Sequence, residues 1–364
     1  MKLGIIGGGQ LGRMLGQAGQ RLGVQSLFLE AAENPSAGVV GEVIVAPYDE
    51  PAALDRLAEE CDAVTFEFEN VPVDAVRYLA GKVKIFPGPG ALEVAQDRLA
   101  EKRFFRSRGI ETTDFVPVDS LEQLEAAIDT LGLPAILKTR RQGYDGKGQQ
   151  VLASPEQAAT AFDALGGVPC ILEDVVAFDR ELSILAVRDQ KGRVATWPVV
   201  ENRHAGGILR WSVAPAPELP EAVEERARDI VTRILEATEY VGVIAVELFQ
   251  VGELLFANEM APRVHNSGHW SIEGAHTSQF ENHVRAVLGL PLGSTDVPLP
   301  CGCVNLLGKM PELSELLAVP GARVHLYDKE PRPGRKLGHV TVLGADRDEV
   351  RQRLDAVRAL ASVG

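Results

Sequence analysis

Two glutamates, Glu247 and Glu259, each end a short apolar run, and Gly252 lies between the runs. This pattern predicts a β-hairpin. A carboxylate in an apolar strand is unfavourable unless it is paired or binds a cation, so two in one hairpin predict a shared metal ion. We expect a three-residue loop over 251–253, which places both glutamates on one face. A two-residue turn at 251–252 would place them on opposite faces, because side chains alternate along a strand.

A polar loop follows the predicted hairpin directly. Residues 262–269 contain an arginine, two histidines and an asparagine, namely Arg263, His265, His269 and Asn266. This composition is typical of an anion-binding loop at the mouth of a site. Taken alone, the hairpin is equally well interpreted as an edge hairpin with solvated acids, and the loop as an ordinary polar loop. Because the two are adjacent, we favour a combined metal and anion site.

The N-terminus carries a glycine-rich turn. A short apolar strand over 2–6 runs into the G-x-G-x-x-G pattern of residues 7–12, and an acid, Glu30, follows about 20 residues later. This is the complete dinucleotide-binding pattern, but its amides and helix N-terminus suit any phosphate, whether from NAD or from a sugar phosphate. The turn therefore predicts phosphate binding and leaves the ligand open.

A second glycine-rich segment lies at 140–149, after an apolar strand that ends at Lys138. Three glycines alternate there with lysine and arginine, which predicts a cover that closes on a polyphosphate. It is not a Walker A loop, because no G-K-[ST] sequence opens a helix. The alternative interpretation is a basic hairpin tip without a ligand.

A third basic loop lies near the C-terminus of this acidic chain. Lys329, Arg332, Arg335 and Lys336 lie among prolines and a glycine. Arginine offers paired donors to phosphate or carboxylate, and the prolines restrict the backbone. We therefore expect an anion site, with a solvated loop as the alternative.

Composition limits the class of protein. The 364 residues suffice for two or three domains, and 45% hydrophobic with 24% charged residues is ordinary for a soluble protein. A net charge of −14 argues against nucleic acid and anionic membranes as partners. Four scattered cysteines form neither a disulfide framework nor a zinc site. With no signal peptide and no membrane-spanning run, we expect a cytoplasmic protein.

The sequence predicts secondary-structure elements that position these residues. Over 1–86 we expect strands and helices to alternate, with the last strand at 83–86. This alternation predicts a doubly wound parallel sheet, with Glu67 at the carboxyl end of a strand, where ligands bind. The Pro-Gly-Pro-Gly sequence of 87–90 predicts a linker, and continuous helices are expected at 91–108 and 271–288.

These motifs together resemble the ATP-grasp superfamily, and within it the 5-(carboxyamino)imidazole ribonucleotide synthase family of purine biosynthesis. The resemblance covers the whole chain and is most specific over 258–270, with further matches at 9–14, 138–148, 327–330 and 335–336. It implies an α/β fold with three parts: a Rossmann-like substrate domain over 1–90, an ATP-grasp domain over 91–298 with a lid over about 112–175, and a C-terminal domain over 299–364.

The family implies an ATP-dependent carbon–nitrogen ligase. Bicarbonate would attack the γ-phosphate of ATP, and the resulting carboxyphosphate would carboxylate aminoimidazole ribonucleotide. A homodimer is implied by the resemblance alone. Mg²⁺, or Mn²⁺ as an alternative, would be held by Glu247 and Glu259. Another ATP-grasp ribonucleotide ligase and an NAD-dependent oxidoreductase remain the alternatives.

The resemblance also implies site residues. ATP would contact a set from the lid and the central strands: Arg98, Lys138, Gly143, Tyr144, Asp145, Gly146, Lys147, Gly148, Gln149, Glu173, Asp174, Val175, Val176, Glu181, His204, Asn258 and Glu259. The expected catalytic residues are Arg263, His265, Asn266, Lys329 and Arg335. The ribonucleotide would contact Gly9, Gln10, Leu11, Glu67, Lys329, Arg335 and Lys336, with its phosphate on the glycine turn and the C-terminal basic loop.

Overall fold

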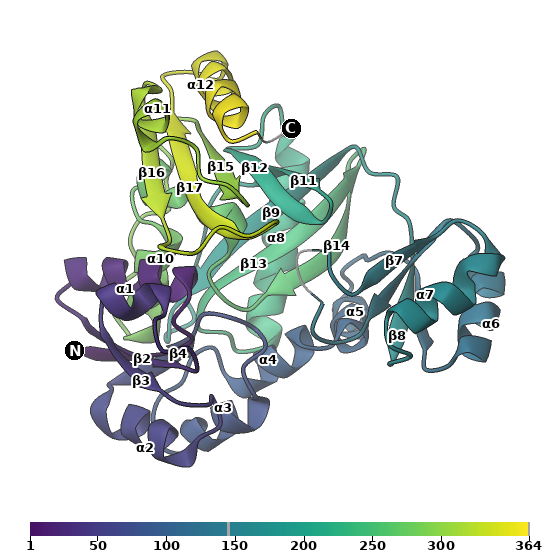
Figure 1. Cartoon of the computed structure of the whole chain (residues 1–364), viewed down its shortest axis with the longest axis horizontal. Coiled ribbons are helices and arrows are strands. Elements are labelled where there is room, and N and C mark those ends of the chain that lie inside the picture. Colours follow the sequence, from purple (N-terminus) through teal and green to yellow (C-terminus); the bar gives the residue numbers. More distant parts are fainter. Residues whose placement is uncertain (144–145, 363–364) are drawn as a thin grey trace.

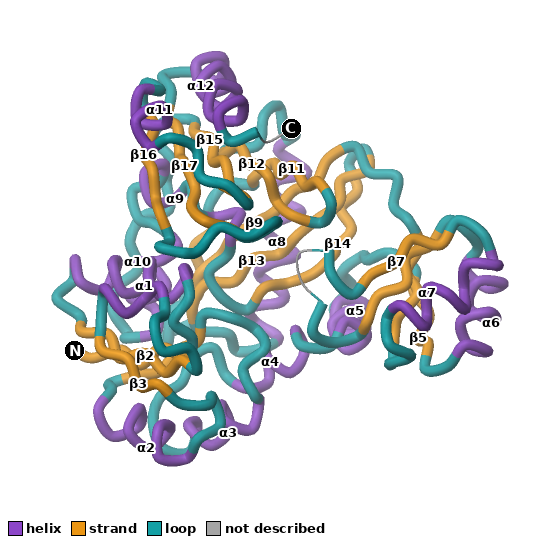
Figure 2. Tube along the Cα trace, viewed as in Figure 1, coloured by secondary structure: helices purple, strands orange, loops and turns teal. Residues whose placement is uncertain are grey.

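A computed structural model describes residues 1–143 and 146–362 of the chain and arranges them around three sheets (Figures 1 and 2). The N-terminal sheet is parallel, with the spatial order β3 (Glu42–Val45), β2 (Gln25–Glu30), β1 (Lys2–Ile6) and β4 (Ala63–Phe66). Its helices are α1 (Gln10–Arg21), η1 (Ser36–Val39), α2 (Pro51–Glu60) and α3 (Val73–Ala80). The predicted doubly wound α/β fold is therefore confirmed.

The prediction of a strand at 83–86 is wrong. This segment forms only an isolated bridge between Ile85 and Val64. The next residue, Pro87, has no backbone N–H and cannot continue a hydrogen-bonded ladder.

A small antiparallel sheet forms the lid and lies to one side of the rest of the chain in Figure 1. Its strands, in spatial order, are β5 (Phe115–Val118), β8 (Cys170–Asp174), β6 (Ala135–Thr139) and β7 (Gln149–Leu152). Helices pack against it: α6 (Leu121–Leu131), η2 (Pro155–Gln157) and α7 (Ala158–Ala164). The second glycine-rich segment connects β6 to β7, so it is attached to the lid.

The third sheet has nine antiparallel strands. Their spatial order is β14 (Leu254–Ala261), β13 (Gly242–Val251), β9 (Arg180–Arg188), β11 (Val200–Ala205), β12 (Ile208–Ala214), β15 (Cys301–Leu307), β17 (Lys336–Leu343) and β16 (Ala322–Leu326), and β10 (Val194–Thr196) also pairs with β9. Because β12 pairs with β15, this sheet continues across the predicted domain boundary at 298. The C-terminal basic loop is thereby held beside the central strands.

Two predicted long helices are each interrupted. Residues 91–108 belong to α4 (Pro89–Ala95) and α5 (Arg98–Ser107), because Asp97 caps α5 by accepting the N–H groups of Leu99 and Ala100. Residues 271–288 belong to α9 (Ser271–Gly274) and α10 (Gln279–Val287), which begins after the cap Ser278. The predicted linker 87–90 is thus partly helical. The remaining helices are α8 (Glu221–Ala237), α11 (Leu313–Ala318), α12 (Arg347–Leu360) and the short η3 (Asn266–Gly268).

His283 of α10 joins the N-terminal sheet to the large sheet. Its Nε2 lies 2.8 Å from Thr65 Oγ1 of β4, and its Nδ1 accepts the backbone N–H of Val243 in β13 at 3.0 Å. The accepting Nδ1 fixes a neutral imidazole that donates from Nε2. Burial lowers the pKa of His283 to about 3, which is consistent with that neutral form.

Among the described residues, no helix is both long enough and apolar enough to cross a bilayer.

Candidate active site

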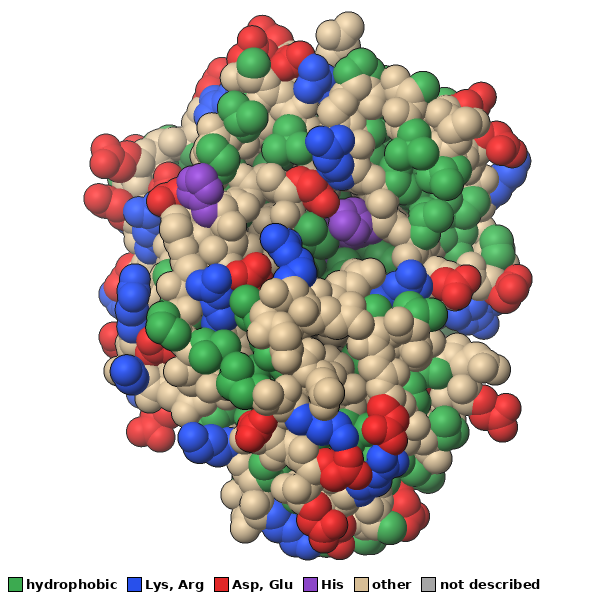
Figure 3. Space-filling model, turned by 90° about the vertical axis from the view of Figure 1, so that its left-hand side faces the viewer, with side chains coloured by type: hydrophobic (Ala, Val, Ile, Leu, Met, Phe, Trp, Pro, Cys, Tyr) green, Lys and Arg blue, Asp and Glu red, His purple; other side chains and the backbone are tan. Residues whose placement is uncertain are grey.

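A cavity of about 650 Å³ lies where the three sheets meet. Lys138 of β6 and Gln149 of β7 line it from the lid, Glu247 and Glu259 line it from the hairpin of β13 and β14, and Lys336 lines it from the start of β17. Figure 3 shows basic and histidine side chains around a hollow near the middle of one face. The cavity therefore connects the predicted nucleotide end with the predicted anion end.

Glu247 and Glu259 are directly paired across β13 and β14, as predicted, but for a different reason. Val251 pairs with Leu254, so the turn has two residues, Gly252 and Glu253, and the predicted three-residue loop is wrong. This register alone would place the two glutamates on opposite faces. The register shifts by one residue at Asn258, a β-bulge that returns Glu259 to the face of Glu247.

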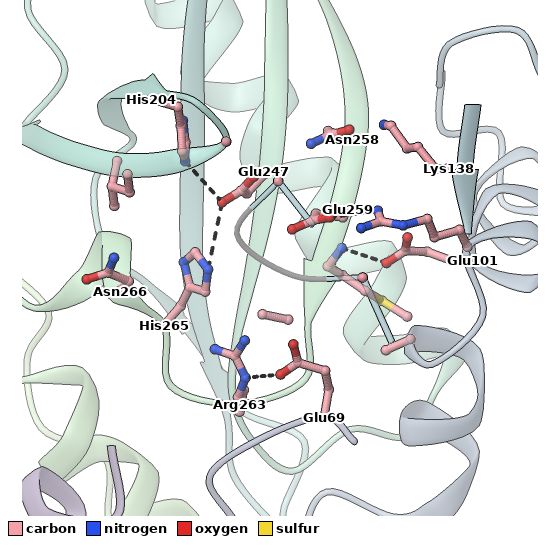
Figure 4. Close-up of a pocket in the computed structure, with 18 of the residues that line it drawn as sticks. Glu69, Glu101, Lys138, His204, Glu247, Asn258, Glu259, Arg263, His265 and Asn266 are labelled. Carbon is pink, nitrogen blue, oxygen red and sulfur yellow. Dashed lines mark hydrogen bonds and ion pairs between the residues drawn. The ribbon is translucent and has the colours of Figure 1, made fainter. Parts of the chain in front are cut away.

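Two imidazoles approach Glu247 from β11 and from the loop after β14 (Figure 4). His204 Nε2 is 3.9 Å and His265 Nε2 is 3.7 Å from Glu247 Oε1. Burial and the charge of Glu259 raise the pKa of Glu247 to about 7. The bond of His204 to Glu181 raises the pKa of His204, although burial acts in the opposite direction. Burial and the charge of Arg263 lower the pKa of His265 far below its usual value. The acidic pair therefore attracts positive charge.

Cations on the lid side balance Glu259. Arg98 Nη1 donates to Glu259 Oε2 at 3.0 Å, and although burial opposes it, this contact lowers the pKa of Glu259. Lys138 donates to Glu173 at 2.8 Å. Although burial opposes it, Lys138 and Lys102 lower the pKa of Glu173 to about 2. Glu173 therefore holds Lys138 at the cavity edge, and its predicted contact with ATP stays a prediction.

The N-terminal glycine turn is occupied by the protein's own carboxylates. Glu67 accepts the N–H groups of Gly9 and Gly12, and Glu30 accepts that of Gly8 at 2.7 Å. Added Cβ atoms would clash: one on Gly12 would lie 2.9 Å from the carbonyl oxygen of Gly7. These three donors therefore have acceptors within the protein, and the contact of this turn with a substrate phosphate stays a prediction.

The loop after β14 turns polar groups toward the cavity. Arg263 pairs with Glu69 of the N-terminal domain, which raises the pKa of Arg263 against the effect of burial. Both side-chain atoms of the Asn266 amide are buried without a hydrogen-bond partner, and so is Asn258 Oδ1. Buried polar atoms without partners are unfavourable, and both asparagines line the cavity. Asn258 and Asn266 therefore have free hydrogen-bonding capacity there.

Most predicted site residues line this one cavity. They are Gln10, Leu11, Glu67, Arg98, Lys138, Gly143, Gly146, Gln149, Glu181, His204, Glu247, Asn258, Glu259, Arg263, His265, Asn266 and Lys336. Others do not line it: Gly9, Lys147, Gly148, Glu173, Asp174, Val175, Val176, Lys329 and Arg335. Lys329 nonetheless donates to Gln10, so its loop reaches the N-terminal domain. Tyr144 and Asp145 lie outside the described residues.

Sequence analysis assigned no site role to several residues that line the cavity. Glu69, Glu101, Phe178 and Phe249 are examples. The rings of Phe178 and Phe249 stack at 4.7 Å, a planar surface next to Glu181. Glu69 follows the same strand end as Glu67 and could have been included on that basis. Glu101 lies inside a helix, and its spacing gave no signal.

Comparisons with known proteins agree with this geometry. Family models match residues 1–96 as a ribonucleotide synthetase preATP-grasp domain, 103–280 as an ATP-grasp domain, and 301–353 as a phosphoribosylaminoimidazole carboxylase C-terminal domain. N5-carboxyaminoimidazole ribonucleotide synthase from Pseudomonas aeruginosa is 49% identical over 360 residues, covering 99% of both chains. The chain belongs to this family. It is an ATP-grasp ligase of purine biosynthesis, as the sequence motifs predicted.

Solved structures of the N5-carboxyaminoimidazole ribonucleotide synthase family share the whole fold. The synthetase from Thermus thermophilus has 53% identity and a TM-score of 0.94, covering 98% of each chain. The synthase from Aspergillus clavatus, solved with ADP and 5-aminoimidazole ribonucleotide, has 31% identity and a TM-score of 0.93, covering 99% of this chain and 98% of that one. Membership in this family excludes the alternative of an NAD-dependent oxidoreductase.

Proposed function

We propose that this protein uses ATP and bicarbonate to carboxylate 5-aminoimidazole ribonucleotide, and that the cavity between the three sheets binds all three substrates. The observation that carries the proposal is one cavity in which the paired carboxylates of Glu247 and Glu259 are joined by Lys138 of the lid, whose charge acts on Glu259, and by Lys336 of β17, whose charge acts on Glu247. ATP would lie at the lid end and the ribonucleotide at the other. The reacting γ-phosphate would then lie near the two glutamates.

Mg²⁺ fits the residues present. Glu247, Glu259 and Asn258 Oδ1 offer only oxygen donors, and Asn258 Oδ1 is buried without a partner. Within the described ranges no group of three or more His, Cys, Asp or Glu side chains is arranged to hold a metal. Mg²⁺ is commonly bound through one or two carboxylates together with water and substrate phosphates. When bound, it would neutralise charge on the β- and γ-phosphates.

The chain's own residues would position and shield the reacting groups. Lys138 would contact the phosphates, the loop after β6 would cover them, and the stacked Phe178 and Phe249 rings offer an apolar wall for the adenine. Arg263, His265 and Asn266 would hold bicarbonate near the glutamates. Excluding water matters because carboxyphosphate hydrolyses readily.

The reaction balances as follows. A bicarbonate oxygen attacks the γ-phosphorus, and the bond to the bridging oxygen of ADP breaks, which gives carboxyphosphate and ADP. Carboxyphosphate releases phosphate and CO₂, and the exocyclic amine of the ribonucleotide attacks the CO₂ carbon. The amine loses one proton as the carbamate forms. Lys336, Lys329 and Arg335 would hold the ribonucleotide phosphate, since the glycine turn has its amides in use.

The test measures ADP release from ATP in bicarbonate, with and without aminoimidazole ribonucleotide, and identifies the carbamate product. ADP release that needs another ribonucleotide instead would support a sister ATP-grasp ligase. We further propose a cytoplasmic homodimer, as expected from the sequence; sedimentation of the purified protein tests its oligomeric state.

A further inference from the structure

The edge strand that carries Glu259 is held by two buried ionisable residues of helix α5. Strand β14 pairs with β13 on one side and ends the sheet, so its outer N–H and C=O groups need other partners. Glu101 Oε1 accepts the N–H of Met260 at 2.7 Å, and Lys102 Nζ donates to the carbonyl oxygen of Asn258 at 2.9 Å. Adjacent residues of α5 therefore bind the backbone on both sides of Glu259.

These contacts fall on the β-bulge. The bulge at Asn258 turns Glu259 toward Glu247, but a bulge breaks the regular ladder and leaves backbone groups without strand partners. Lys102 also lies 3.4 Å from the carbonyl oxygen of Ala257, which accepts the Thr112 hydroxyl at 2.7 Å. The N–H of Ala257 donates to the backbone carbonyl oxygen of Glu111 at 2.8 Å. The outer side of the bulge is therefore bonded to side chains and to this loop carbonyl rather than to another strand.

The same lysine reaches the lid. Lys102 Nζ lies 3.5 Å from Glu173 Oε2 of β8, and Glu173 in turn binds Lys138 of β6. Glu101 and Lys102 are only 2% and 1% exposed. Burial and the charge of Glu259 raise the pKa of Glu101 to about 8, and burial lowers the pKa of Lys102. Burying ionisable groups is costly, and apolar side chains of similar size would fill the space with less desolvation. General stability therefore explains this arrangement poorly.

We infer that Glu101 and Lys102 are positioning residues that fix the 258–260 bulge. They would keep Glu259 opposite Glu247 and at a fixed position relative to Lys138 of the lid. Lys102 does not line the cavity, whereas Glu101 does, and both residues would act through Glu259 and Glu173. This inference rests on the proposed binding of Mg²⁺ by Glu247 and Glu259. It predicts that their loss weakens Mg²⁺-dependent nucleotide binding more than it weakens the fold.

The test uses matched variants of the full chain. Glu101→Gln keeps an oxygen acceptor for the Met260 N–H, whereas Glu101→Met keeps the length and loses it. Arg103→Met, at an exposed position of the same helix, is the control. ADP binding is titrated against Mg²⁺, and the thermal midpoint of each variant is measured without ligand.

We expect the Mg²⁺ concentration for half-maximal ADP binding to rise at least about tenfold in Glu101→Met and in Lys102→Met. It should stay within about threefold of the parent protein in Glu101→Gln and Arg103→Met. If Glu101→Met does not fold, Lys102→Met provides the same comparison.

Parent-like Mg²⁺ dependence in folded Glu101→Met and Lys102→Met would overturn the inference, as would equal impairment of Glu101→Gln and Glu101→Met. Failure of the proposed function is distinct, because the parent protein would then bind ADP without any dependence on Mg²⁺.

Discussion

Glu247 and Glu259 face each other across β13 and β14 only because Asn258 adds one residue to β14. The two-residue turn of this hairpin would otherwise turn one of the two carboxylates away from the cavity. A bulge next to a site is a common way to redirect a side chain. Here it brings two carboxylates together and adds the amide oxygen of Asn258 beside them.

Replacement of either glutamate should abolish turnover. Glu247→Gln and Glu259→Gln each remove one charge from the pair, so we expect ADP release at saturating ATP to fall at least about 100-fold, as for loss of a charged group that acts on the transition state. Steady-state kinetics over a range of Mg²⁺ concentrations checks this. Glu253→Gln, at the exposed hairpin tip, is the control. Near-normal turnover in Glu247→Gln would contradict the assignment.

The sequence predicted the chemistry of this site better than its geometry. The acids, the polar loop after β14 and the basic C-terminal loop were identifiable because charged residues in apolar or proline-rich surroundings are unusual. Their meeting in one cavity could not be derived from local patterns, because it depends on the pairing of β12 with β15. The bulge at Asn258 was also hidden, since its residue type is ordinary in either register.

The buried supports of the site were the hardest to predict. Glu101 and Lys102 look like solvated residues of an amphipathic helix, and only the fold shows that they face an edge strand. The break between α4 and α5 was missed because Asp97 in a helical pattern resembles any polar position until its capping bonds are seen. The bonds that the Glu67 carboxylate accepts from the amides of Gly9 and Gly12 were also not predicted, and its contact with substrate stays a prediction.

NAD should not bind, despite the complete glycine pattern. A dinucleotide pyrophosphate needs the amides that Glu67 and Glu30 already occupy. We expect NAD at millimolar concentration to leave the thermal midpoint unchanged, whereas ATP with Mg²⁺ raises it by several degrees through preferential binding to the folded state. Differential scanning fluorimetry gives the comparison. A shift with NAD of the size seen with ATP would refute this interpretation of the turn.

Lys336 should affect the ribonucleotide much more than ATP. It begins β17 and lines the cavity from the C-terminal part of the large sheet, whereas Lys138 lines it from the lid. Loss of one charge-assisted hydrogen bond to a phosphate is worth roughly 1.5–3 kcal/mol. We therefore expect Lys336→Ala to raise the KM for aminoimidazole ribonucleotide at least about tenfold and to change the KM for ATP less than about threefold. Lys309→Ala, at an exposed loop position, is the control, and equal effects on both substrates would count against the assignment.

His283 should make the fold sensitive to acid. Its pKa falls to about 3 in the folded chain, from an ordinary value near 6.5, so between these values the unfolded chain binds the extra proton and stability declines as the pH falls. His283→Gln loses the bonds to Thr65 and Val243 at every pH but also loses this titration. The stability difference between parent and variant should therefore shrink by about 2 kcal/mol from pH 7 to pH 5. Urea unfolding at both pH values measures it, and His276→Gln, at an exposed site, corrects for the loss of a histidine as such. A difference that stays constant would show that the imidazole between the two sheets is not held neutral.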